Sequence, residues 1–259
     1  ASGSRRVIHK NADDLIQENS NSFSGSLNYH KKFGNVHSEF LLEGFCTILE
    51  NPFANKYGAP DSLGNVEYIR VNAEDGAKVY GANFEINLAP KNNIKFQIGG
   101  TVQKSEYETP QAWGEEENSV SREFMRTPAT YGYMTFNWDI TKRLSTNINT
   151  VYTGHMLVPH FGLDPNTTEP NEIEALQNGD VIEGEKLEKT KTFSKIGIRF
   201  SYNFNLSKEV KFQFYTGVKN ILNHIQHDHD RGVFRDAGYI YGPSQPRVIY
   251  IGIKIGNLI

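Results

Sequence analysis

The segment NHIQHDHDR, residues 223–231, concentrates side chains that could bind a metal ion or a ligand. The five side chains are those of His224, His227, His229, Asp228 and Asp230. Imidazole and carboxylate groups are frequent metal ligands, but this spacing matches no specific zinc signature. A solvated polar loop explains such a cluster more often than ligand or metal capture does. We therefore predict no metal and no cofactor, and treat the three histidines as weak candidates for ligand contact.

Two further histidines, His155 and His160, flank the segment GHMLVPH. No nucleophile pattern is adjacent to them, so an external binding surface or ordinary loop packing is expected in place of catalysis. The acidic runs WGEEENSVSRE and EPNEIEALQNGDVIEGEKLEK are typical of solvated loops, although they could select cationic or metal-bearing ligands. We expect the chain to be no enzyme and to bind a ligand only weakly by itself.

The elements that must position these residues alternate between apolar and polar side chains. In SKIGIRFSYNFNL, residues 194–206, Ile196, Ile198 and Phe200 take one parity while Lys195 and Arg199 take the other. A period of two residues indicates a β-strand with different side chains on its two faces. The period leaves open which face is inside, because a soluble sandwich hides its apolar face whereas a membrane barrel turns that face toward lipid.

The same alternation recurs along the chain and pairs into hairpins. Hairpins are predicted between residues 23–30 and 36–48, 82–88 and 94–103, 132–140 and 144–152, and 194–206 and 212–218, followed by a closing strand at 247–256. We count about nine strands in an all-β, antiparallel, up-and-down order. The one doubtful helical turn lies near residues 169–178.

Short and long connections alternate strictly between these strands. Turns are expected near residues 32–35, 90–93, 140–143 and 206–209, and long links near 50–66, 108–125, 158–190 and 223–246. An up-and-down sheet then has every tight turn at one end and every long loop at the other, which is typical of transmembrane β-barrels. Most strands hold about 11 to 15 residues, more than the 9 to 11 that a tilted strand needs to cross the hydrocarbon.

These patterns predict which side chains face lipid. Aromatic residues of the apolar parity next to the tight turns would form an interfacial girdle: Tyr29, Phe136, Trp138, Tyr202 and Phe204. Side chains expected on the lipid side are Ile196, Ile198, Phe200, Ile251 and Ile253. Side chains expected toward a wet interior are Lys195, Arg199 and Lys254.

Composition supports a membrane barrel and makes nucleic acid an unlikely partner class. Only 37% of the 259 residues are hydrophobic, which is little for so many strands, and the formal net charge is -3. No basic run or RNA-binding signature is present, so we predict no nucleic-acid binding. The single cysteine, Cys46, excludes an intrachain disulfide framework. The first residues match neither a signal peptide nor a transmembrane helix.

The C-terminal segments VKNILN, residues 218–223, and YGPSQPRVIYIGIKIG, residues 241–256, resemble the last two strands of TonB-dependent outer-membrane receptors. VYTGHMLVPH, residues 151–160, is similar to the external end of a strand in such receptors. The resemblance implies part of a larger barrel of about 22 strands in the outer membrane of a Gram-negative bacterium. It also implies TonB-driven uptake of a small ligand, such as a siderophore, cobalamin, a glycan or a peptide, bound at external loops.

On this reading, residues 1–259 form a single C-terminal β-barrel segment, with outer-membrane lipid as a partner. The plug domain and the N-terminal barrel strands are expected to be missing partners, and TonB would act through the absent plug. The ending GNLI departs from the terminal aromatic residue that is common in such barrels. Two alternatives remain: a soluble β-barrel that binds a small apolar ligand inside, and a membrane-embedded barrel hydrolase with a Ser and His pair at its rim.

Overall fold

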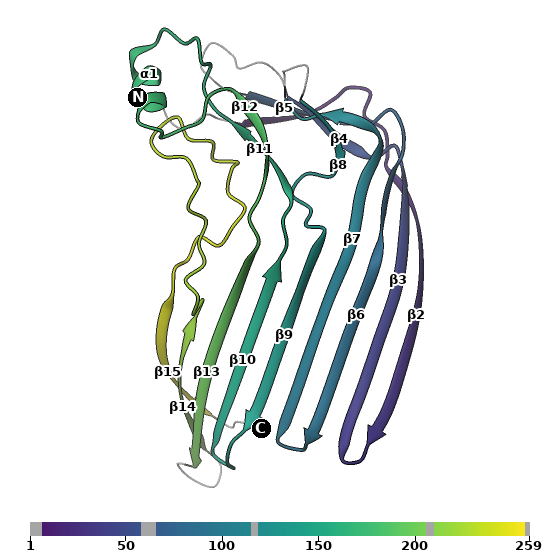
Figure 1. Cartoon of the computed structure of the whole chain (residues 1–259), viewed down its shortest axis with the longest axis vertical. Helices are drawn as coiled ribbons and strands as arrows, with labels where there is room; N and C mark the ends of the chain where they lie inside the picture. Colours follow the sequence, from purple (N-terminus) through teal and green to yellow (C-terminus); the bar gives the residue numbers. More distant parts are fainter. Residues whose placement is uncertain (1–6, 58–65, 115–118, 206–209, 257–259) are drawn as a thin grey trace.

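The computed structural model describes the chain except for residues 1–6, 58–65, 115–118, 206–209 and 257–259. One antiparallel sheet dominates the described part of the chain (Figure 1). Its nine long strands are β2 (Asn19–Phe33), β3 (Val36–Glu50), β6 (Ala77–Lys91), β7 (Ile94–Ala112), β9 (Thr130–Asp139), β10 (Leu144–Thr153), β13 (Phe193–Asn205), β14 (Lys211–Lys219) and β15 (Val248–Gly256).

Strands that are consecutive among these nine pair with each other, and β2 and β15 lie at the two edges. The spatial order is β15, β14, β13, β10, β9, β7, β6, β3, β2, and a short tenth strand, β8 (Val120–Glu123), pairs with β7 beside this path. The predicted all-β, up-and-down architecture of about nine long strands is therefore confirmed. The four predicted hairpins are the pairs β2 with β3, β6 with β7, β9 with β10, and β13 with β14.

Local chemistry explains the tight turns at one end of the sheet. Gly34 connects β2 to β3 with φ of 60°, a conformation that glycine adopts without steric cost. The Thr141 hydroxyl accepts a hydrogen bond from the Leu144 backbone N–H at 2.9 Å and closes the turn between β9 and β10. Pro90 falls within a register shift between β6 and β7, where its missing N–H costs no ladder bond. The turn predicted at residues 206–209 lies outside the described residues.

The long connections lie at the opposite end and contain regular structure of their own (Figure 1). Strands β1 (Val7–Asn11), β4 (Phe53–Tyr57) and β5 (Val66–Asn72) form a small sheet, and β11 (Leu157–Phe161) pairs with β12 (Glu185–Lys189). The doubtful helical turn is a true helix, α1 (Pro170–Gln177), with proline in its first turn and the favourable charge of Glu172 near its N-terminus. No helix in the described ranges is long and apolar enough to cross a membrane.

The two faces of the sheet differ as the alternation predicts. Phe200 pairs with Thr216, which pairs with Ile251, so these residues share the outer face, and 71% of Ile251 and 59% of Ile253 is exposed. Ile196 and Ile198 lie on that face but are half-buried between neighbouring strands. The buried apolar side chains gather mainly in the loops rather than on the sheet: Trp113, Val158, Leu163, Val181 and Tyr239.

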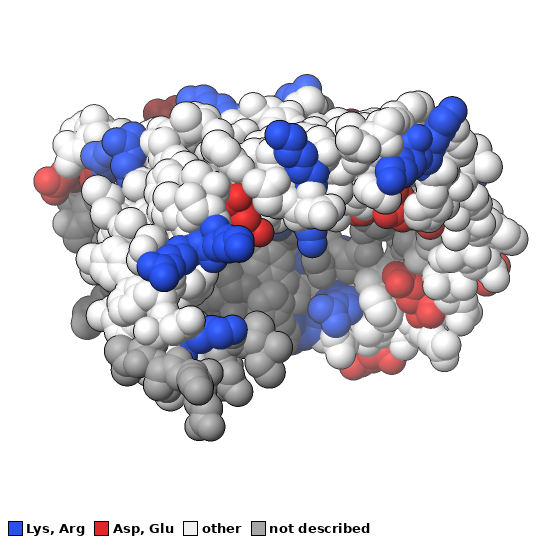
Figure 2. Space-filling view, turned by 90° about the horizontal axis from the view of Figure 1, so that it is seen from below, with Lys and Arg blue, Asp and Glu red and all other residues white. Residues whose placement is uncertain are grey.

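The opposite face is hollowed and polar, as predicted. Arg199 and Lys254 line one cavity together with Asn147 and Gln213. Seen from the end with the tight turns, the molecule is hollowed, and Lys and Arg side chains border the hollow (Figure 2). A soluble barrel with an apolar interior would place the isoleucines here, so that alternative is wrong about the facing of Arg199 and the isoleucines.

Candidate functional site

The hollowed face carries a hydrogen-bonded polar wall across β9, β10, β13 and β14. Arg199 donates to the Gln213 side-chain oxygen at 3.1 Å, and its guanidinium carbon lies 4.2 Å from the centre of the Tyr215 ring. Gln213 in turn donates to the Asn203 side chain at 2.8 Å. Such mutual pairing satisfies polar groups that face away from the apolar surface, and suits a wet interior rather than an apolar ligand.

Farther toward the loops, the wall becomes acidic and contains an aromatic side chain packed over glycine. The Tyr133 hydroxyl donates to the Glu85 carboxylate, and the Tyr133 ring covers Gly99, where an added Cβ would lie 2.8 Å from a ring carbon. Glycine at this strand position permits the close approach of the ring. Glu43 accepts a hydrogen bond from Asn83 at 3.0 Å on the same face.

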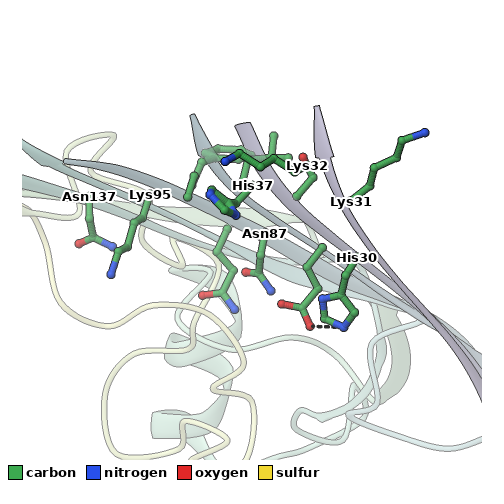
Figure 3. Close-up of a pocket in the computed structure, with 13 residues that line it drawn as sticks. His30, Lys31, Lys32, His37, Asn87, Lys95 and Asn137 are labelled. Carbon is green, nitrogen blue, oxygen red and sulfur yellow. Dashed lines mark ion pairs between the residues drawn. The ribbon is translucent and has the colours of Figure 1, made fainter. Parts of the chain in front are cut away.

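A groove of about 520 Å³ lies on the hollowed face near the tight turns (Figure 3). Its lining includes His30, Lys32, His37 and Lys95, and its one carboxylate is that of Glu39. The His30 Nε2 atom lies 3.7 Å from a Glu39 carboxylate oxygen, drawn as the dashed line in Figure 3. The groove is therefore rich in groups that can carry positive charge, at the end of the wall away from the loops.

A second polar assembly, here termed the His160 cluster, joins the long loops and consists of His160, Asp230, Asp236 and Tyr239. His160 and Asp230 are buried, and the His160 Nε2 atom donates to the Asp230 carboxylate at 2.9 Å. The Tyr239 ring stacks on the imidazole with centroids 3.6 Å apart and planes inclined by 1°. The other Asp230 oxygen accepts from the Asp236 backbone N–H at 2.8 Å. The cluster thus links the β10–β13 connection to the β14–β15 connection.

Two tyrosines extend this contact network toward Asp228. The Tyr241 hydroxyl donates to the Asp228 carboxylate at 2.6 Å, and the Tyr239 hydroxyl lies 3.4 Å from the same oxygen. Burial raises the pKa of both tyrosines well above the ordinary value, and the nearby Asp228 charge adds to the effect. Both phenols are therefore neutral hydrogen-bond donors at physiological pH.

The structure separates the five histidines that the sequence proposes for ligand contact. His160 is buried in the cluster, whereas His155 lies exposed at the edge of a cavity beside β7. The His224 Nδ1 atom accepts from the Ser194 backbone N–H at 3.3 Å, and the His229 Nδ1 atom lies 3.3 Å from the Gln226 carbonyl oxygen. His227 is exposed. Their role in ligand binding stays a prediction.

Neither a metal-binding cluster nor a hydrogen-bonded Ser–His pair is found in the part of the chain that the structure describes. No three His, Cys, Asp or Glu side chains converge there in a way that could hold a metal ion. Within the same residues, no serine hydroxyl forms a hydrogen bond with a histidine ring, so the Ser and His pair required by the hydrolase alternative is not found.

Sequence reasoning missed Tyr239, Tyr241 and Asp236 as parts of the loop assembly. Asp236 accepts from the Phe161 backbone N–H at 3.1 Å, although the two residues are 75 positions apart. A local pattern could not reveal this contact. The one available signal was the pair of tyrosines at alternate positions in GYIYG, in a loop that otherwise reads as polar.

No protein-family model and no curated protein sequence matches the chain. Solved structures do match. The ferric-catecholate import receptor Fiu from E. coli K12 aligns with a TM-score of 0.56 at 16% identity, over 95% of this chain and 28% of the receptor. A ferric enterobactin receptor mutant, PfeA from Pseudomonas aeruginosa, gives 0.55 at 15%, over 94% and 32%. The copper transporter OprC gives 0.58 at 10%, over 95% and 33%.

The chain thus spans about a third of the length of these proteins, and almost all of it is matched. The matched proteins are transport receptors rather than enzymes. The resemblance to a barrel segment of TonB-dependent receptors, first suggested by the C-terminal segments, is confirmed at the level of the fold. The open antiparallel sheet described above has the fold of a section of such a receptor barrel.

Proposed function

We propose that this chain forms part of the wall of an outer-membrane receptor barrel that takes up a small ligand. The observation that supports it best is the combination of an apolar outer face, a polar hollowed face and structured loops at one end only. In this proposal the outer face contacts lipid, and the loops lie outside the cell. The polar wall surrounds the ligand path.

The proposed activity is energised import, in which TonB acts through a plug domain within the complete receptor. The matched structures include an import receptor for ferric catecholates and a receptor for ferric enterobactin, which favours a siderophore among the ligands considered. Cobalamin, a glycan or a peptide would use the same architecture. The chain would contribute positioning and binding groups and no catalysis.

Single-cysteine labelling of the natural full-length protein on intact cells tests this topology. Cys46, half-buried on β3, is first replaced by serine so that the introduced thiol is the one derived from this chain. Cysteines at Asn178 and His227, in two different long loops, should react with a membrane-impermeant maleimide. A cysteine at Asn35, in a tight turn, should react only after the outer membrane is permeabilised. Equal labelling at all three positions on intact cells would refute the proposal.

A further inference from the structure

A cavity of about 300 Å³ lies where the loop end of β7 meets two segments of the long loops. It is bounded by residues 103–105 of β7, the segment 123–129, residues 155–157 and Lys189 of β12. Gln103 and Ser105 share the inward parity of Thr101 on β7, whereas Lys104 has the opposite parity, so the cavity lies at the edge of β7 and reaches the hollowed side of the sheet. Ligand pockets in proteins begin at about this volume.

Backbone hydrogen bonds hold the walls of this cavity together. The Phe124 backbone N–H donates to the Ser105 carbonyl at 3.1 Å, and the Arg126 backbone N–H donates to the Leu157 carbonyl at 2.8 Å. The Met156 backbone N–H donates to the Thr190 hydroxyl at 3.0 Å, and the Thr190 backbone N–H donates to the Met156 carbonyl at 2.9 Å. Arg126 adopts φ of 59°, which is unfavourable for a residue with a side chain, and its guanidinium donates to the Gly238 carbonyl. A strained, cross-linked frame of this kind is preorganised, which reduces the entropic cost of binding.

The polar groups around the cavity favour an anion. Lys189 and His155 are exposed, and their side chains make no ion pair or hydrogen bond with any residue that the structure describes. Lys104 also lines the cavity but is paired with Glu106, its Nζ atom 2.8 Å from the carboxylate. Glu123 is the one carboxylate of the lining. Lys189 and His155 are therefore the basic groups of the lining that remain available to contact a negative group.

The remaining lining is apolar, with one buried hydroxyl that lacks a partner. Phe124, Met156 and Leu157 supply the apolar surface. Ser105 is 9% exposed, and its hydroxyl has no hydrogen-bond partner among the described residues. Such an unpaired polar atom costs about 1 to 3 kcal/mol, so binding that brings a partner or an ordered water to it is favoured. The cavity therefore suits an apolar body that carries one negatively charged group.

We propose that this cavity binds the anionic arm of the imported ligand, with Lys189 and His155 contacting the negative group and Phe124 and Met156 packing on the body. This inference rests on the proposed receptor function, because it places the cavity on the path of an external ligand. The volume accommodates one arm of a siderophore-sized molecule and not the whole of it. The contact is one part of a larger binding surface.

Three matched probes test the charge preference in the full-length protein purified in detergent. Phenylacetate, 2-phenylethanol and 2-phenylethylamine share an aromatic body and differ in charge, and saturation-transfer NMR titrations give their relative affinities. We expect phenylacetate to bind best and 2-phenylethylamine worst. Lys189→Gln should weaken phenylacetate binding about tenfold, because a hydrogen bond to a charged group is lost, and should leave 2-phenylethanol unchanged.

Lys186→Gln provides the control, because Lys186 is an exposed lysine of the same strand that does not line the cavity. His155→Gln should weaken phenylacetate binding as well. This second variant keeps the test valid if Lys189→Gln fails to fold. Failure of all three probes to bind, a preference for the amine, or equal effects of Lys189→Gln and Lys186→Gln would overturn the inference. External labelling at Asn178 with no preference for phenylacetate would refute this inference alone, whereas loss of that labelling would refute the receptor function.

Discussion

Replacing His160 by alanine should weaken the contact between the two long loops without unfolding the sheet. The side chains of His160 and Asp230 are only 3% and 4% exposed, and their hydrogen bond of 2.9 Å is a buried side-chain link between the β10–β13 and β14–β15 connections. Two bonds that involve backbone groups, Phe161 N–H to Asp236 and Arg231 N–H to the Asp180 carbonyl, also join these connections. His160→Ala removes this bond and also the stacked contact with Tyr239. The main sheet is held by ladder hydrogen bonds that do not involve these residues.

The expected cost follows from the burial of the pair. Losing a hydrogen bond to a charged group costs about 1.5 to 3 kcal/mol. The Asp230 carboxylate keeps the bond from the Asp236 backbone N–H, and the lost ring stacking adds about 0.5 to 1.5 kcal/mol. A total of about 2 to 4.5 kcal/mol is expected for the local stability of the loops.

Hydrogen exchange measured by mass spectrometry reads this local stability directly. If amides of β11 and of residues 226–242 exchange through local opening, a loss of 3 kcal/mol speeds their exchange about a hundredfold or more, and strands β10 and β13 stay protected. His227→Ala, which removes an exposed imidazole of the same loop, should change nothing. Less than a threefold effect of His160→Ala, or equal deprotection of β10, would show that the cluster does not join the loops.

Three further outcomes test the sheet and the loop electrostatics. Ile198→Arg should destabilise the membrane-inserted protein by about 2 to 4 kcal/mol if the residue lies near the bilayer midplane. Asn149→Arg, on the polar face, should cost little. Urea unfolding of the protein in vesicles measures both free-energy changes. Gly99→Val should cost about 1 to 3 kcal/mol in the same assay because of the tyrosine ring above it, and Gly25→Val, which meets nothing within 4 Å, much less. The pKa of Tyr241 is raised in the folded protein, so the folded loops keep a proton that the unfolded chain releases above about pH 10. The protection of loop amides against hydrogen exchange should therefore fall as the pH rises beyond about 10. The fall should be less steep in Tyr241→Phe.

The long strands could be predicted from the sequence because the pleat alone sets their period of two. The apolar and polar residues of β13 alternate in the sequence as their side chains alternate between the two faces of the sheet. The pairing of β13 with β14 follows from the short connection between them. The facing of Arg199 and Ile251 also followed once strand length and loop asymmetry favoured a membrane barrel. Both features depend on strand geometry and on which solvent each face of the sheet meets. Both are therefore visible as an alternation of residue types between neighbouring positions.

The loop elements could not be predicted in the same way, because their stability comes from contacts between distant segments. Strand β11 reads LVPHF, contains a proline and is buried without alternation, and its partner β12 reads EKLEK, a polar sequence with no strand signal. His160 and Asp230 are 70 positions apart. The spacing that brought His224, His227 and His229 to attention is a property of the chain and does not require their side chains to converge.

The distribution of buried apolar surface implies that sheet and loops are stabilised by different means. The loops contain buried side chains such as Leu163 and Val158, 2% and 0% exposed, whereas every residue of β2 is exposed. In hydrocarbon, each unpaired backbone group at the edges β2 and β15 would cost several kcal/mol, so insertion into a membrane as proposed would require strands that pair with those edges. The loops carry their own core and polar cluster. Substitutions in the loops should therefore alter the geometry of this end while the main sheet stays intact.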